Sequence, residues 1–300
     1  MFLNKLKTGT MYGPVLTLLV ALSLAARDVL LSDTFQHTSV FLTIISTFFP
    51  IVVCILIYRA FKENLFVLFK GMWGLIVKIN VFNAVAFILF LFALKFCHPV
   101  YVAVVFGSIR WVVMYIAEPD HVGYSNHTKL IVPGLLLVTF FVFVIALLDS
   151  PLIYLVGLVL ALLSGGISSY EVFYEKEMSK RNIGATTILA LRFMLLILVS
   201  FGVAVVQKND FSDLNMTISQ YILLFSVTAL PAFFAQVAIA NTYPITFVAI
   251  FSLIPAFIFL ISLIYGLSEI SALTSLVVLV YSLTVVVGNY LHGWRTRGGS

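Results

Sequence analysis

Charged residues are scarce in this sequence. Asp, Glu, Lys and Arg together make up only 10% of its 300 residues, whereas 62% are hydrophobic. In a soluble globular domain about a quarter of the residues are charged. This scarcity excludes a chain whose main solvent is water and indicates an integral membrane protein.

Cysteine and the common catalytic motifs are also scarce. Cys54 and Cys97 are the only cysteines, and their spacing fits neither a metal site nor a disulfide framework. The sequence has no Ser-centred nucleophile elbow and no glycine-rich phosphate loop. Its net charge of +5 lies in short loops rather than in a basic domain. We therefore expect no enzymatic activity, no cofactor, no metal and no nucleic-acid partner.

Long apolar runs are what the sequence has instead. They are about 19 to 24 residues long, the length of a helix that spans a bilayer, and they do not alternate at period two as barrel strands do. The sequence therefore predicts an all-α integral membrane protein with ten transmembrane helices. The predicted spans are Tyr12–Leu31, Ser39–Tyr58, Gly71–Leu94, Pro99–Ala117, Leu130–Leu148, Leu152–Val172, Ala185–Val206, Ile218–Ala240, Pro244–Tyr265 and Ala272–Asn289.

Lysine and arginine are distributed unevenly over the two sides of these spans. With the N-terminus in the cytoplasm, only Arg27, Lys95 and Lys208 fall on the outer side. Eleven basic residues then fall on the inner side: Lys5, Lys7, Arg59, Lys62, Lys70, Lys129, Lys176, Lys180, Arg181, Arg295 and Arg297. The positive-inside rule predicts that both termini are cytoplasmic. The compact loops favour a bacterial inner membrane, with an intracellular organelle of a eukaryote as the alternative.

Two passages of the sequence match each other without gaps. In residues 93–106 and again in residues 238–251, a helix ends in small apolar residues, a polar turn with proline follows, and a new apolar helix begins. We therefore divide the chain into a first repeat, 1–149, a second repeat, 150–292, and a tail, 293–300, that ends like a tag scar. Because each repeat has five spans, the second is predicted to be inverted. Inverted repeats place a binding site near the bilayer midplane and permit alternating access.

The same passages resemble the EamA type of the drug/metabolite transporter superfamily, whose members have ten helices in two EamA repeats. In that family, the passage from the third to the fourth helix has an Ala-Leu-Lys-like step, a short turn, an apolar helix and a glutamate. Here it runs from Ala93 to Glu118, and its second copy runs from Ala238 to Glu269. The resemblance covers nearly the whole chain. It implies a transporter without implying a substrate, because relatives carry amino acids, nucleotide sugars, amines and other metabolites.

Arg110 stands where the family often has a proline, whereas the second copy keeps Pro255 at the matching position. By the resemblance, this part of the fold borders the central cavity. An ionisable side chain within a span is costly unless it faces a cavity or a partner. Arg110 is therefore a candidate for binding a carboxylate or phosphate, with Trp111 and Tyr115 beside it. The alternative is that it reaches lipid headgroups or an internal ion pair.

Further charged residues are predicted in the cytoplasmic half of the spans. Lys78 and Arg192 lie there, with Glu171 and Glu118 as counter-charges. They form either a basic inner vestibule for the solute or ion pairs and snorkelling side chains. Tyr170 beside Glu171 is either a substrate gate or part of an interfacial aromatic belt.

The first helix carries two charged residues near its predicted outer end. Arg27 and Asp28 point about 100° apart on a helix, so we expect each to need a separate partner or water. They act either as a gate and a proton or cation site, or as a wet helix end. Asn83, Gln236 and Asn241 either supplement the cavity or make interhelical hydrogen bonds.

Together these features predict a secondary transporter that moves a small polar metabolite by alternating access. We expect an amino-acid-like or other carboxylate-bearing solute, surrounding membrane lipids, and protons as a candidate coupling ion. An alternative is a carrier of cationic or nucleoside-containing solutes such as S-adenosylmethionine, in which Asp28, Glu171 and the aromatic residues would dominate binding. A membrane enzyme and a non-transporting structural subunit are the remaining alternatives.

Overall fold

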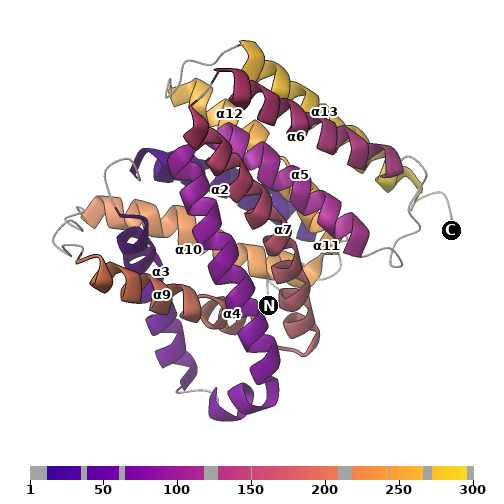
Figure 1. Ribbon diagram of the computed structural model, residues 1–300. Helices are drawn as coiled ribbons and strands as arrows, with labels where there is room; N and C mark the ends of the chain where they lie inside the picture. The colour runs from indigo at the N-terminus through magenta and orange to yellow at the C-terminus, as the bar shows by residue number, and fades with distance from the viewer. Residues whose placement is uncertain are drawn as a thin grey trace.

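The chain is helical wherever its structure is described. The computed structural model describes residues 12–34, 39–60, 65–117, 128–149, 151–208, 218–242, 244–265 and 272–295, and all regular structure in these ranges is α-helix (Figure 1). The helices are α2 (Tyr12–Thr34), α3 (Val40–Ala60), α4 (Leu65–Phe96), α5 (Pro99–Ala117), α6 (Thr128–Asp149), α7 (Leu152–Lys180), α8 (Ala185–Arg192), α9 (Met194–Val206), α10 (Ile218–Asn241), α11 (Pro244–Phe251), α12 (Ile254–Tyr265) and α13 (Ala272–Arg295). The predicted all-α class is confirmed.

Eight of the described helical segments are long and apolar enough to cross a membrane. Shorter apolar helices, Leu230–Asn241 and Ala272–Val287, lie in the two other predicted spans. Large apolar side chains such as Phe140, Leu198 and Leu279 are exposed on the outside of the bundle. An outer surface of this kind suits lipid and would favour aggregation in water. These features fit an integral membrane protein, while the number of ten spans stays a prediction, as does the cytoplasmic location of the termini.

Two of the predicted spans are each broken into two helices. The break between α11 and α12 begins four residues after Val248 and lies just before Pro255. Proline has no backbone N–H, and in a continuous helix its ring would clash with the carbonyl of residue 251. No proline accompanies the break between α8 and α9 at Phe193. There, the side chain of Asn80 on α4 replaces the lost helical hydrogen bonds.

Asn80 bonds to the backbone on both sides of the α8–α9 break. Its Nδ2 donates to the carbonyl of Leu191 at 2.7 Å, and its Oδ1 accepts from the backbone N–H of Leu195 at 2.9 Å. One turn along α4, Nδ2 of Asn83 donates to the carbonyl of Arg192 at 2.8 Å. Because a free backbone group is expensive away from water, these amides stabilise the break. They also fix the position of Arg192 at the end of α8.

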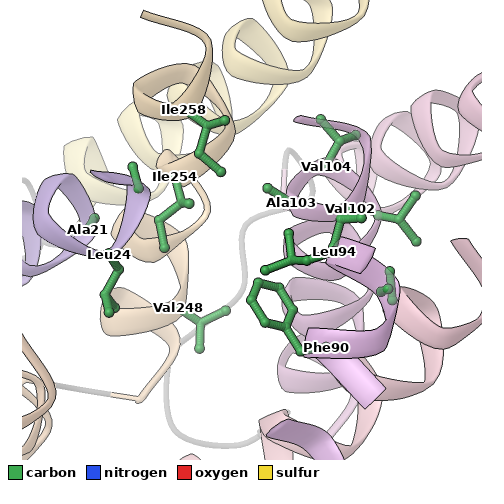
Figure 2. Packing of buried hydrophobic residues seen from close by; sticks show 14 of the residues in the cluster. Ala21, Leu24, Phe90, Leu94, Val102, Ala103, Val104, Val248, Ile254 and Ile258 are labelled. Atoms are coloured by element: carbon green, nitrogen blue, oxygen red, sulfur yellow. The ribbon is translucent and has the colours of Figure 1, made fainter. Parts of the chain in front are cut away.

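Helix α7 lies at the centre of the packing, along both α4 and α5, while α2 packs along α10, α11 and α12 (Figure 1). Helices α3 and α9 lie side by side, and so do α6 and α13. A large apolar cluster joins these helices. Figure 2 shows part of it, with Leu24 and Ile254 on one side and Phe90, Leu94 and Ala103 on the other.

Small residues on α7 allow the close approach of its neighbours. Ser164 Oγ donates to the carbonyl of Ala86 on α4 at 2.7 Å. A Cβ atom added at Gly165 would lie 2.5 Å from the carbonyl oxygen of Phe106 on α5. Since that oxygen belongs to the backbone of a packed helix, the contact leaves no room for a side chain. The next residue, Gly166, has open space at the same position.

The two neighbouring glycines therefore give a matched test of the α5–α7 contact. Gly165→Ala should lower the free energy of unfolding by about 1 to 3 kcal/mol, as expected for overpacking. Gly166→Ala should leave it unchanged or raise it by about 0.5 to 1 kcal/mol, because alanine is the better helix former. Thermal melting of the purified variants in one detergent would measure both. Equal melting temperatures for the two variants would contradict the packing described.

Candidate functional site

A cavity of about 110 Å³ lies within the helical bundle. Residues of α2, α3, α4 and α5 line it from the first half of the chain, and residues of α7, α8, α10, α11 and α12 line it from the second. Figure 2 shows Leu24, Val248 and Ile254 of its apolar wall on one side and Phe90 and Ala103 on the other. The volume admits several water molecules or a small solute.

Charged side chains from four helices face this apolar space. Three of them are arginines and three are carboxylates. The six are Arg27 and Asp28 of α2, Arg110 of α5, Glu171 and Glu175 of α7, and Arg192 of α8. If all six are ionised, their charges cancel, but they are not all paired with one another. Which of them lacks a partner decides what the cavity can bind.

Arg192 is held between two carboxylates of α7. Its Nη1 donates to Oε1 of Glu175 and lies 3.5 Å from Oε1 of Glu171. Its guanidinium carbon also lies 4.5 Å from the centroid of the Phe193 ring. An ion pair with Glu171 is one of the two roles that the sequence left open for Arg192, and the structure contains this pair, although Glu175 is the closer partner. Glu118, also expected as a counter-charge, lies outside the described residues.

Arg27 and Asp28 form an ion pair with each other. Nε and Nη2 of Arg27 donate to Oδ1 of Asp28 at 2.8 and 2.5 Å. The expectation that each would need a separate partner is wrong. It treated the 100° between adjacent side chains as decisive, whereas the long arginine side chain folds back far enough to span that angle. The guanidinium also lies about 6 Å from two aromatic rings, at 5.9 Å from the centroid of Phe87 and 6.0 Å from that of Phe90.

Arg110 differs from the other two arginines of the cavity. It is 7% exposed, and its Nε has no hydrogen-bond partner among the described residues. No described carboxylate lies within ion-pair distance of it either. Instead, its guanidinium carbon lies 5.6, 5.9 and 4.8 Å from the ring centroids of Phe106, Phe247 and Phe251. Aromatic faces attract a cation, but they do not satisfy its N–H donors.

Six of the twelve predicted site residues do not line the cavity. Lys78 is exposed, with its Nζ 5.7 Å from the ring centroid of Tyr174. Tyr170 is 44% exposed and packs against Phe82. Trp111 is buried and stacks on Tyr115, with ring centroids 5.8 Å apart and an interplanar angle of 10°.

The two remaining predicted residues are amides of α10. Asn241 is exposed, and its Nδ2 donates to the carbonyl of Val237 at 2.7 Å. Gln236 is 2% exposed, and neither of its amide atoms has a hydrogen-bond partner among the described residues. Asn83, in contrast, both lines the cavity and makes the interhelical hydrogen bond to α8 that was one of its two predicted roles.

Sequence reasoning missed Glu175 and the phenylalanines around Arg110 as site residues. Glu175 lies four residues after Glu171, and this spacing places both carboxylates on the same face of a helix. The sequence therefore contained the information needed to include Glu175. Phe106 lies one turn before Arg110, and Phe251 is its match in the aligned passages. Phenylalanine is so frequent in this chain that such a position does not stand out by residue type alone. In the described ranges, no group of three or more His, Cys, Asp or Glu side chains is placed to hold a metal ion.

Comparisons with known proteins identify the fold alone. No protein-family model matches the sequence, and neither does any curated protein. A protein of known crystal structure is similar over 97% of this chain and 99% of its own, with a TM-score of 0.65 and 13% sequence identity. The two chains therefore share one architecture from end to end. At this identity the likeness carries no information about a ligand.

Arg192 and Arg181 both pair with glutamates of α7, but losing them should lower the free energy of unfolding by different amounts. Arg192→Gln leaves buried carboxylates without their cation and should lower the free energy of unfolding by about 3 to 5 kcal/mol. Arg181→Gln removes an exposed partner of Glu177, whose Oε1 lies 3.1 Å from Nε of Arg181, and should cost about 0 to 1 kcal/mol. Denaturant titration of both variants in the same detergent would measure the difference. A loss for Arg192→Gln no larger than that for Arg181→Gln would contradict the buried pair.

Proposed function

We propose that this chain is a secondary transporter that moves a small carboxylate-bearing or otherwise anionic solute across a membrane by alternating access. One observation carries the proposal. Arg110 faces the cavity without an ion-pair partner in the described part of the chain, while the cavity's other arginines, Arg27 and Arg192, are both paired. A solute carboxylate would be the missing partner.

A buried guanidinium without an opposite charge is costly. Removing a cation from water costs several kcal/mol, and an opposite charge with good hydrogen-bond geometry offsets that cost. Arginine can bind a carboxylate through two parallel N–H bonds. The rings of Phe106, Phe247 and Phe251 surround the same group with apolar surface. The arrangement therefore favours a solute that joins an anionic group to an apolar body.

Internal symmetry supports the proposed inverted repeat. A Cβ atom added at Gly157 of α7 would lie 2.9 Å from Cβ of Cys97, and one added at Gly13 of α2 would lie 2.5 Å from Oγ1 of Thr242. Cys97 and Thr242 are matched residues of the aligned passages. The first helix of each half thus packs a glycine against the same joint of the other half.

The helix pairing repeats in the same way. Helix α7 packs along α4 and α5, and α2 packs along α10 and the α11–α12 pair. The two broken helices, α8–α9 and α11–α12, both contribute to the cavity wall, and discontinuous helices commonly form binding sites in secondary transporters. These features support ten spans in two repeats and the EamA type as the proposed family. A bacterial inner membrane is the proposed location, supported by the compact loops between the predicted spans.

A carrier of cationic solutes is the second candidate. It is favoured by Oε1 of Glu171, which is buried at the cavity and accepts no hydrogen bond from the described residues. In that case Glu171 and Asp28 would hold the solute, and Arg110 would be dispensable for binding. Variants of Arg110 therefore distinguish the two candidates.

Screening small metabolites for a rise in the melting temperature of the purified protein should first identify a carboxylate-bearing ligand. Arg110→Gln should then weaken its binding about 10- to 100-fold, the effect of losing about 1.5 to 3 kcal/mol of charged hydrogen bonding. Arg110→Lys should bind with intermediate affinity, because lysine keeps the charge but not the fork. Uptake into proteoliposomes should fall in the same order.

Lys78→Gln is the matched control, since it also removes a cation from a predicted span but from an exposed position outside the cavity. It should leave affinity and uptake unchanged. Arg110→Gln with unaltered affinity for the carboxylate would reject the proposal. If the screen instead returned cations that bind equally well to this variant, the second candidate would replace it.

A further inference from the structure

The carboxylates of Glu171 and Glu175 outnumber their cation. They lie one turn apart on α7, and both approach the same nitrogen, Nη1 of Arg192. Glu175 takes the hydrogen bond from this nitrogen, while Oε1 of Glu171 lies 3.5 Å away and has no hydrogen-bond partner in the described structure. Glu171 is 9% exposed and Glu175 is 1% exposed. One guanidinium therefore serves two buried carboxyl groups.

Other charges near this cluster are engaged elsewhere or farther away. On α5, Arg110 lines the same cavity but lies beyond ion-pair distance of both carboxylates. On α4, Lys78 is exposed and lies over the ring of Tyr174. On α7 itself, Nζ of Lys176 donates to three carbonyl oxygens at the end of α10, each at 2.9 Å.

The remaining elements around the cluster do not supply a second cation. Helices α10 and α11 contain no charged residue in their sequences. On α2, Arg27 is paired with Asp28. On α6, the side chains from Ile131 to Leu148 are all uncharged. Glu171 and Glu175 thus share Arg192 alone among the described side chains.

Two ionised carboxylates that approach the same nitrogen atom repel each other strongly. Burial increases this repulsion because the surroundings screen it poorly. Carboxyl pairs in other proteins relieve such repulsion by sharing one proton. Both carboxyl groups contact the same guanidinium nitrogen, Nη1 of Arg192, so they lie close to each other. A proton on one of them would turn it into an O–H donor toward the other, and would leave one negative charge for Arg192.

We propose that Glu171 and Glu175 together bind one exchangeable proton and form a proton-binding site in the wall of the cavity. The step is a simple protonation, in which a carboxylate oxygen takes a proton from water in the cavity and returns it there. The site stands on the geometry of these three side chains. Its role in driving transport rests on the proposed function.

For transport, the site would link proton binding to solute binding. A solute anion bound at Arg110 would offset the positive charge of that arginine and so make the potential at the carboxyl pair more negative. This change favours protonation of the pair, and by linkage the bound proton favours the anion equally. The cavity would then bind an anion and a proton together with no net change in charge. That outcome lowers the cost of carrying both through the membrane.

Infrared spectroscopy of the purified protein in H₂O and D₂O tests the site without any solute. A protonated carboxyl group has a carbonyl stretch that is separate from the carboxylate bands and shifts in D₂O. The wild type should show such a band, and the band should disappear as the pH is raised over the range in which the protein stays folded, because raising the pH removes the shared proton. Glu171→Gln should remove the titrating band, because Glu175 alone is fully neutralised by Arg192.

Glu177→Gln is the matched control, since Glu177 lies on the same helix in an exposed ion pair with Arg181. It should keep the band unchanged. Glu171→Asp keeps both carboxyl groups, so it should keep a band that titrates at a shifted pH. This variant tests the proton site if Glu171→Gln fails to fold. Identical titrating bands in the wild type and Glu171→Gln, or no such band in the wild type, would overturn the proposal.

Proton uptake measured with a pH indicator separates the site from the proposed function. Benzoate, a carboxylate on an apolar ring, serves as the probe. If it binds to the wild type at a pH where the infrared band of the free protein has disappeared, a single proton should be taken up with it, and Glu171→Gln should bind it without that uptake. If benzoate and the metabolite screen both fail while the infrared band behaves as expected, the proton site stands and the proposed function falls. Benzoate binding with no proton uptake in the wild type would overturn the linkage.

Discussion

The cost of taking a charged side chain out of water governs the interior of this protein. Each buried charge needs an opposite charge, a set of hydrogen bonds or a route to water. Arg27 meets this requirement with its own neighbour, Asp28, and Arg192 meets it with Glu175 and Glu171. Arg110 has no described carboxylate within ion-pair distance, and its guanidinium lies against three phenylalanine rings. The proposed anion site and the proposed proton site both follow from this uneven distribution of partners.

The broken helices are what bring these charges to one place. Arg192 reaches the cavity because α8 ends immediately after it, and Asn80 and Asn83 satisfy the backbone groups that the break exposes. The α11–α12 break near Pro255 brings Phe251 over Arg110 in a comparable position. In a nonpolar environment, such breaks survive only where side chains replace the lost hydrogen bonds or where the backbone lines a cavity. The amides of α4 are therefore part of the architecture of the site rather than ligands in their own right.

Close packing around α7 limits where the cavity can lie. Gly165 and Ser164 allow α5 and α4 to approach α7 closely, so the space between these helices is filled by backbone contacts. Glu171 and Glu175, which also line the cavity, follow about two and three turns later on the same helix. A small-residue stretch followed by Glu171 and Glu175 thus sets both the contact and the site on a single helix.

The sequence by itself determined the helical class and the apolar character of the chain, because the length of an apolar run and the scarcity of charge follow directly from the solvent that a helix must face. It also pointed to Arg110, Arg192 and Glu171, since an ionisable residue within an apolar run is conspicuous wherever it falls. Only the tertiary structure decided which of these residues have partners. Pairing depends on distances of a few ångströms between residues far apart in the chain, such as Glu175 and Arg192, and on side-chain reach, as for Arg27 and Asp28. Neither quantity is encoded in the spacing of residues along one helix.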